Sequence, residues 1–102
     1  MMADTRLVER MRAGAEGGFE EFFDRFFPAL YRFALPRLDR NADLAEEVVQ
    51  ATLCRAIDKL HTYRGEAALF TWLCTICRHT ISDHWRRGHA RARTHLAVFG
   101  AA

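Results

Sequence analysis

Apolar residues recur along most of this chain at steps of three and four, the spacing of helices that bury one face. In the first half of the chain this stripe comprises Phe19, Phe22, Phe23, Phe26, Leu30 and Phe33. Pro28 lies inside the stripe and Pro36 lies near its end. Because proline lacks a backbone N–H and clashes with the preceding turn, we expect a kink at Pro28 and fraying at Pro36.

A second long helix is expected to begin at Asn41. Asparagine can cap the first turn with its side-chain oxygen, and Asp43 adds a negative charge near the positive end of the helix dipole. The apolar face of this segment comprises Ala45, Val48, Val49, Thr52, Leu53, Ala56, Ile57 and Leu60. The sequence Tyr63-Arg64-Gly65 ends the pattern, since glycine commonly terminates helices.

A third long helix follows, and residues 4–13 fit a short helix ahead of the glycine-containing segment 14–18. The apolar side of the third long helix comprises Leu69, Phe70, Leu73, Ile76, Cys77, Thr80, Ile81 and His84. No segment shows the sustained alternation that is typical of strands. The pattern therefore predicts an all-α fold, a compact bundle of three to four helices.

The composition fits one domain with one modest core. The chain has 102 residues, of which 50% are hydrophobic and 27% charged, and this excludes intrinsic disorder. No apolar run approaches the ~18 residues of a membrane span, and the amino terminus does not resemble a signal peptide. We therefore expect a cytoplasmic protein without membrane contact, in which the three cysteines stay reduced.

The net charge of +2 conceals an uneven distribution. Residues 1–60 carry nine Lys and Arg against eleven Asp and Glu, a net charge of −2. Residues 61–102 carry six Arg against two acids, a net charge of +4, and all five His. This asymmetry indicates that the second half of the chain faces a polyanion.

Polar residues occupy the side of the second long helix that the core does not need: Asp43, Glu46, Glu47, Gln50, Cys54 and Asp58. Charge on a helix face is most often simply solvated. The alternative is an electrostatic docking surface for a basic partner, centred on Glu46, Glu47 and Gln50. Spacing alone leaves both interpretations open.

The third long helix has a comparable second side, made of Trp72, Thr75, His79, Ser82, Asp83 and Arg86. A tryptophan away from the core can stack on a nucleobase, and arginines pair with phosphates. The nearby arginines are Arg78, Arg86, Arg87, Arg91 and Arg93. Alternatively, Trp72 packs at the rim of the core and the arginines only solubilise this end, but the interleaving favours single-stranded nucleic acid.

Motifs for metal binding or catalysis are weak. Cys74 and Cys77 form a C-x-x-C pair, but they lie in mid-helix beside core positions, whereas zinc cysteines usually come from a tight turn. Haem attachment needs a histidine directly after the second cysteine, where Arg78 stands. We find no phosphate-binding loop, Ser-His-Asp arrangement or catalytic acid pair. The sequence therefore predicts no metal, no cofactor and no enzymatic activity.

The order of these motifs resembles region 2 of bacterial sigma factors, in the extracytoplasmic-function (ECF) group of the sigma-70 family. The similarity rests on residues 43–53, residues 63–73, then Arg78, Asp83 and Arg86-Arg87, and it covers about residues 5 to 93. It implies a region 2 domain at residues 1–95, with 96–102 as the start of a linker. We expect no counterpart in these residues of the family's second domain, a helix-turn-helix module called region 4.

The resemblance implies two binding surfaces. In the family, the helix that matches residues 45–50 docks on the clamp helices of the largest-type subunit of the RNA polymerase core. This assigns polymerase binding to Asp43, Glu46, Glu47 and Gln50. Glu47 stands where the family usually has Asp, while Ala51 and Leu53 replace Glu and Phe, so we expect a weaker or shifted contact.

The loop at residues 63–68 resembles the family's specificity loop, which captures an extruded base of the minus-ten promoter element on the non-template strand. The following helix resembles the part that reads and melts that element. DNA binding is thereby assigned to Tyr63, Arg64, Trp72, Thr75, Arg78, His79, Arg86 and Arg87. His79 replaces the family's usual Asn, and an imidazole cannot copy the paired donor and acceptor of a carboxamide, so we expect a different base preference.

Two other hypotheses remain open. The chain could be a sigma-like helical module that acts mainly through an anti-sigma factor or another regulatory protein, without direct DNA contact. A zinc-binding helical module, with Cys54 or a histidine completing the site, is the weaker hypothesis.

Overall fold

The computed structural model describes the backbone of residues 2–99 and the side chains of residues 4–88. Within that range every regular element is helical, which confirms the predicted all-α class. The elements are α1 (Met2–Arg12), α2 (Gly18–Ala34), the 3-10 turn η1 (Leu35–Leu38), α3 (Ala42–Asp58), the 3-10 turn η2 (Leu60–Thr62) and α4 (Leu69–Phe99).

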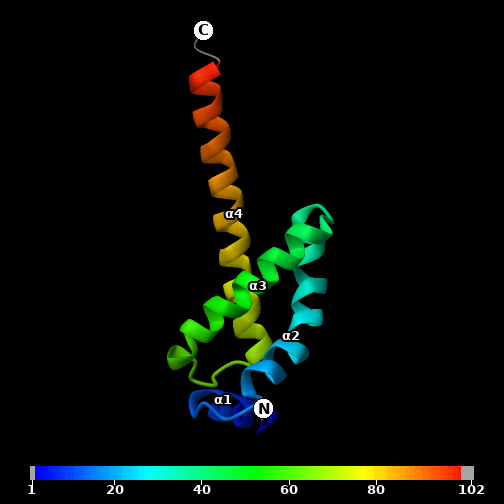
Figure 1. The fold of residues 1–102 in the computed structure, drawn as a ribbon, viewed down its shortest axis with the longest axis vertical. Coiled ribbons are helices and arrows are strands. Elements are labelled where there is room, and N and C mark those ends of the chain that lie inside the picture. Colours follow the sequence, from blue (N-terminus) through cyan, green and yellow to red (C-terminus); the bar gives the residue numbers. More distant parts are fainter. Residues whose placement is uncertain (1, 100–102) are drawn as a thin grey trace.

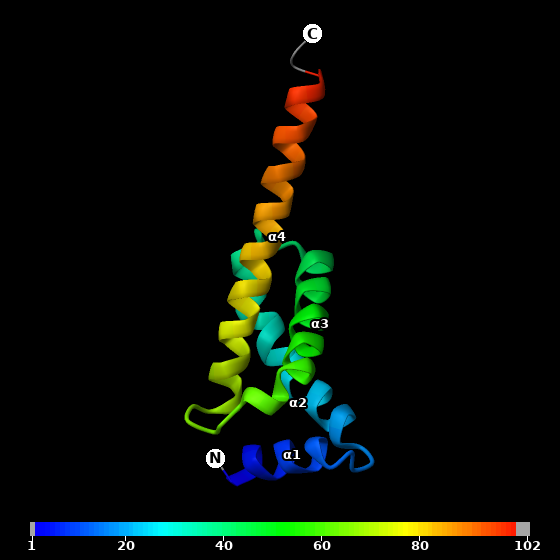
Figure 2. The same cartoon turned by 90° about the vertical axis from the view of Figure 1, so that its left-hand side faces the viewer.

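The helices α2, α3 and α4 each pack against the other two, and α1 lies across one end of this group (Figures 1 and 2). Helix α4 is the longest element and extends well beyond its neighbours, so that the molecule measures 60 × 25 × 25 Å. Helix α4 continues without a break past residue 95, the position at which the sequence predicts the domain to end. None of the helices in the described range has the length and apolar character that crossing a membrane requires.

The core is built from the apolar stripes that the spacing predicts. In α3 the buried residues are Ala45, Val48, Val49, Thr52, Leu53 and Ala56, and in α4 they include Leu69, Leu73, Ile76, Cys77, Thr80 and Ile81. In α2 the stripe is partly wrong. Phe22, Phe26 and Leu30 are buried and Phe23 and Phe33 half-buried, but Phe19 is 40% exposed because it occupies the first turn of α2, at the rim of the core.

The ends of the helices follow local rules. The Asn41 side chain accepts a hydrogen bond from the Leu44 N–H at 3.1 Å, which confirms the predicted cap of α3. Helix α2 continues through Pro28 and ends at Ala34, just before the turn that contains Pro36. Between η2 and α4 lies the predicted break, where Gly65 has a φ of 78° that a side chain would disfavour.

Candidate protein and nucleic-acid interfaces

The side of α3 opposite the core carries Asp43, Glu46, Glu47 and Gln50, all of them exposed. Within the described part of the chain no ion pair engages these carboxylates. We call these four residues the α3 face. The structure brings together all four residues that the sequence predicts for protein binding, and it leaves their charge available to a partner.

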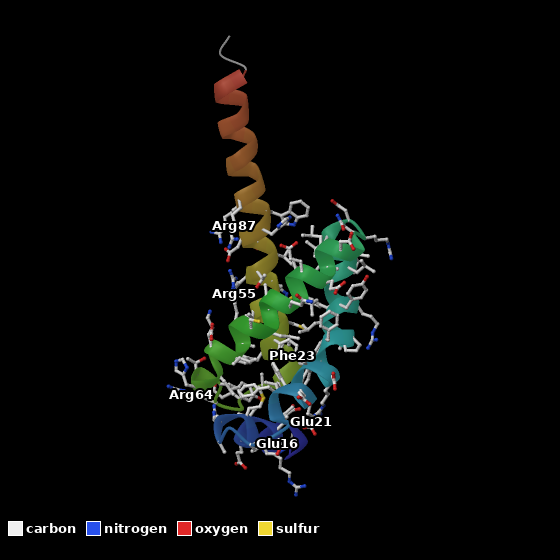
Figure 3. The ribbon with its side chains drawn as sticks, viewed as in Figure 1. Glu16, Glu21, Phe23, Arg55, Arg64 and Arg87 are labelled. Atoms are coloured by element: carbon white, nitrogen blue, oxygen red, sulfur yellow. The ribbon has the colours of Figure 1, made fainter. Side chains whose placement is uncertain are left out.

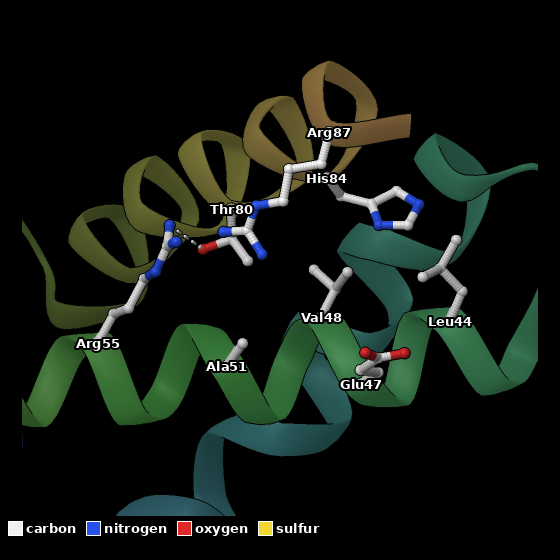
Figure 4. Close-up of a pocket in the computed structure, with 8 residues that line it drawn as sticks. All are labelled: Leu44, Glu47, Val48, Ala51, Arg55, Thr80, His84 and Arg87. Carbon is white, nitrogen blue, oxygen red and sulfur yellow. Dashed lines mark hydrogen bonds between the residues drawn. The ribbon is translucent and has the colours of Figure 1, made fainter. Parts of the chain in front are cut away.

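Glu47 also borders an open hollow between α3 and α4, with a volume of about 310 Å³ (Figure 4). Arg55 lines the hollow from α3, and Thr80, His84 and Arg87 line it from α4. The acidic α3 face therefore passes directly into a basic strip where the two helices meet.

The same two helices are linked by Asp83. Its carboxylate accepts a hydrogen bond from the Arg55 guanidinium at 2.9 Å and pairs on its other oxygen with Arg86. Arg55 also donates to the Thr80 hydroxyl at 3.2 Å (Figure 4). The hydrogen bond from Arg55, followed by that from Arg86, lowers the pKa of Asp83 below its ordinary value. Asp83 is thus a link between α3 and α4, a role that the sequence did not indicate.

Tyr63 and Trp72 form a packed pair at the start of the second interface. The Tyr63 ring is buried, with 8% exposure, and its hydroxyl donates to the Ala67 carbonyl at 2.5 Å. Burial, and then the charge of Asp4, raises the pKa of Tyr63. The Trp72 ring lies 5.1 Å from the Tyr63 ring and remains half-exposed, so the structure supports rim packing and still leaves part of the indole accessible.

The other residues predicted to bind DNA fall into three groups. Thr75, His79 and Arg86 are exposed on α4, after Trp72 in the helix. Arg64 is exposed on the loop (Figure 3). Arg78 leans toward α2, with its guanidinium carbon 5.6 Å from the Phe33 ring.

On the opposite flank, Arg87 lies in the hollow beside α3. The side chains of Arg91 and Arg93 lie outside the described residues. We call the loop 63–68 and the predicted DNA-binding residues of α4 the α4 face: Trp72, Thr75, Arg78, His79, Arg86 and, at the border with α3, Arg87.

The cysteines do not form a ligand cluster in the described structure. Cys74 and Cys77 are buried in α4, whereas Cys54 is exposed on α3. Burial raises the pKa of both buried thiols, which opposes formation of the thiolate that a metal would need. Among the described residues no three His, Cys, Asp or Glu side chains are grouped so that they could hold a metal ion.

Comparison with known proteins identifies the family of this bundle. Residues 22–91 match the family model for Sigma-70 region 2, so the chain belongs to that family. It is similar to ECF sigma factors: it is 31% identical over 86 residues to the ECF RNA polymerase sigma factor BldN of Streptomyces coelicolor, an alignment that covers 83% of this chain and 32% of that protein.

Two further relatives give the same result. The RNA polymerase sigma factor CarQ of Myxococcus xanthus is 37% identical over 79 residues, covering 78% of this chain and 45% of CarQ. The ECF RNA polymerase sigma factor SigC of Mycobacterium tuberculosis is 36% identical over 96 residues, covering 90% and 51%. This chain therefore spans between about a third and a half of these relatives. No solved structure matches it significantly.

Proposed function

We propose that this domain is a non-catalytic transcription initiation module, which acts in the cytoplasm. Its α3 face binds the RNA polymerase core, and its α4 face recognises and melts the promoter minus-ten element on the non-template strand. The observation that carries this proposal is that the acidic and basic faces lie on different, adjoining helices. A protein partner and a DNA partner can therefore be bound at the same time.

The polymerase side is supported by the free charge of the α3 face. Its carboxylates are exposed and lack ion-pair partners in the described structure, so a basic surface can approach without first breaking an internal contact. Clamp helices of the polymerase core are such a partner in the relatives' family. The α3 backbone is fixed by its buried side, so the face is presented on a rigid element.

A pull-down with bacterial RNA polymerase core tests this side. We expect Glu46→Arg to weaken retention of the core by at least about 10-fold, because a like charge replaces an opposite one at the contact. Glu9→Arg makes the same charge reversal at an exposed position of α1 and serves as the matched control. Equal retention of the core by both variants would contradict the assignment of the α3 face.

The DNA side is supported by the position of the loop 63–68 beside the partly accessible ring of Trp72. Opening a duplex costs a few kcal/mol per unstacked step, and capture of an extruded base on protein offsets part of that cost. Arg64 on the loop and His79 on α4 provide exposed cationic and polar groups on the Trp72 side, and Arg86 adds an exposed cation further along the same helix. We assign Tyr63 the role of shaping the loop, because its ring is buried and its hydroxyl is bonded to Ala67.

Titration of a labelled single-stranded DNA at several salt concentrations tests this side. Affinity should fall with salt, and Arg64→Ala should make the slope of log affinity against log salt shallower by about 0.7 if it removes one phosphate contact. Arg32→Ala, an exposed arginine of α2, is the matched control and should leave the slope unchanged. An affinity that is independent of salt would exclude the DNA assignment.

A regulatory protein, such as an anti-sigma factor, is a second candidate partner. The feature that favours it is on α2, where Phe19 and Phe23 line an open hollow beside Glu20 and Asp24. Exposed aromatic rings with polar rims often mark protein contacts. A regulator that docks there should lose affinity for Phe19→Ala and bind Arg86→Gln normally. The opposite pattern in a calorimetric titration with an anti-sigma protein would exclude this site.

A further inference from the structure

Helix α1 precedes residues 22–91, which match the family model, and it sits directly beneath the loop at residues 63–68 (Figures 1 and 2). Leu7, Val8 and Met11 anchor it in the core, with exposures of 1–3%. These buried side chains fix α1 to the core, so the helix can hold the segments that bind to it in place. Two of its polar side chains reach the two ends of the loop.

Arg12 holds the first end. Its Nη2 atom donates to the Leu60 carbonyl at 2.8 Å and to the Tyr63 carbonyl at 2.6 Å. The Leu60 carbonyl also accepts the Tyr63 N–H at 3.1 Å, so Arg12 uses its second lone pair, and a cation at the end of a helical turn also interacts favourably with the dipole. A single guanidinium thus fixes η2 and the residue at which the loop begins.

Asp4 holds the second end. Its Oδ2 atom accepts a hydrogen bond at 3.2 Å from the backbone N–H of Leu69, the first residue of α4. The neighbouring Ala67 and Ala68 have no side chain that could cap this helix, so the cap comes from a residue 65 positions earlier. The Oδ1 atom of Asp4 lies 3.3 Å from the Arg25 guanidinium, which orients the carboxylate.

We propose that α1 is a clamp that positions the loop for base capture, with Asp4 and Arg12 as its positioning residues. This inference rests on the DNA-binding function proposed above. Both ends of the loop are fixed to one rigid helix, while Arg64 and Glu66 between them stay exposed. A loop that is ordered in advance loses less conformational entropy when it closes on a base. Because it also cannot reshape itself around a base that does not fit, the clamp increases selectivity for the captured base.

Hydrogen exchange on the full chain tests the clamp without any DNA. Asp4→Ala should speed exchange of the Leu69 amide by about 10-fold or more, whereas Asp4→Asn, which keeps an acceptor oxygen, should restore most of the protection. Arg10→Ala is the matched control, because this α1 arginine pairs with Glu21 on the surface and does not contact the loop. Unchanged protection of Leu69 in Asp4→Ala would overturn the clamp.

A measurement of DNA selectivity tests the proposed role of the clamp in base recognition. The probe is a single-stranded DNA sequence that the original chain enriches from a randomised pool, compared with the unselected pool. Asp4→Ala and Arg12→Ala should lower the affinity ratio between the two by about 10-fold, with Arg10→Ala and binding to the polymerase core unaffected.

Loss of protection in the exchange experiment without loss of selectivity would overturn the recognition role of α1. If the original chain enriches no sequence at all, the proposed DNA function fails and the recognition role fails with it, while the exchange result still decides whether the clamp exists.

Discussion

Asp83 has a structural role because it joins residues that are far apart in the sequence. It receives Arg55 from α3 and Arg86 from its own helix, and it is less exposed than either arginine. A carboxylate with two such partners is held in its charged form, which is why its pKa lies below the ordinary value of 3.8. At the scale of single residues, this link adds a polar contact to the apolar packing between α3 and α4.

The lowered pKa of Asp83 predicts a pH-dependent contribution to stability. A group whose folded pKa is depressed stabilises the fold above its unfolded pKa, and the contribution is lost as the pH falls through the folded value. Asp83→Asn should therefore lower the urea midpoint at pH 7, and the difference from the original chain should narrow at pH values below 3.8. A difference that is the same at pH 7 and pH 3 would contradict the link.

The three cysteines should react at very different rates. Cys54 is exposed, whereas Cys74 and Cys77 are buried and have raised pKa values. A thiol reagent at neutral pH should thus modify one thiol quickly and the other two only when the chain unfolds. Counting modified thiols over time measures this, with Cys54→Ser as the control that should abolish the fast phase. Two or three fast thiols would show that the α4 core is open.

Local chemistry predicted some residues of the structure and could not predict others. The Asn41 cap was predictable because the bond to Leu44 spans three residues. The bonds from Arg55 to Asp83 and from Leu69 to Asp4 span 28 and 65 residues, and no sequence rule for helices reaches so far. For the candidate site, the exposed residues were predictable, but the side chains that hold them in place were not.

At the scale of the elements, apolar spacing predicted the helices well because each one buries a single side. Phe19 is the exception: the stripe includes it, but the core does not extend over the first turn of α2. The pattern shows which side of a helix is apolar and does not show how far along the helix the neighbours reach. How far the neighbouring helices cover the apolar side of α2 depends on how the whole bundle assembles.

The start of α3 offers a direct test of how much one cap contributes. Asn41→Ala removes the acceptor for the Leu44 N–H and should lower the free energy of unfolding by about 1 kcal/mol, measured by urea denaturation. Asn41→Asp keeps an acceptor oxygen at the same position, so its free energy of unfolding should be close to that of the original chain. If Asn41→Asp destabilises as much as Asn41→Ala, the cap is not what stabilises this end.

At the scale of the whole molecule, the net charge of +2 conceals surfaces of opposite sign. The α3 face is acidic and the α4 face basic, and they adjoin at the hollow between Glu47 and Arg87. The buried side chains that α3 and α4 share, together with the link through Asp83, hold the two faces next to each other. We therefore expect a protein partner that binds the α3 face to determine the orientation of the α4 face as well.

The most direct test of the two-face proposal measures both partners in one experiment. Fluorescence anisotropy of a labelled minus-ten non-template oligonucleotide is recorded with the chain and the RNA polymerase core together. Glu46→Arg should weaken assembly with the core by at least about 10-fold, whereas Arg64→Ala should leave the core bound and weaken only binding of the oligonucleotide. If both variants lose both partners equally, or neither variant loses any, the proposal of separate faces is wrong.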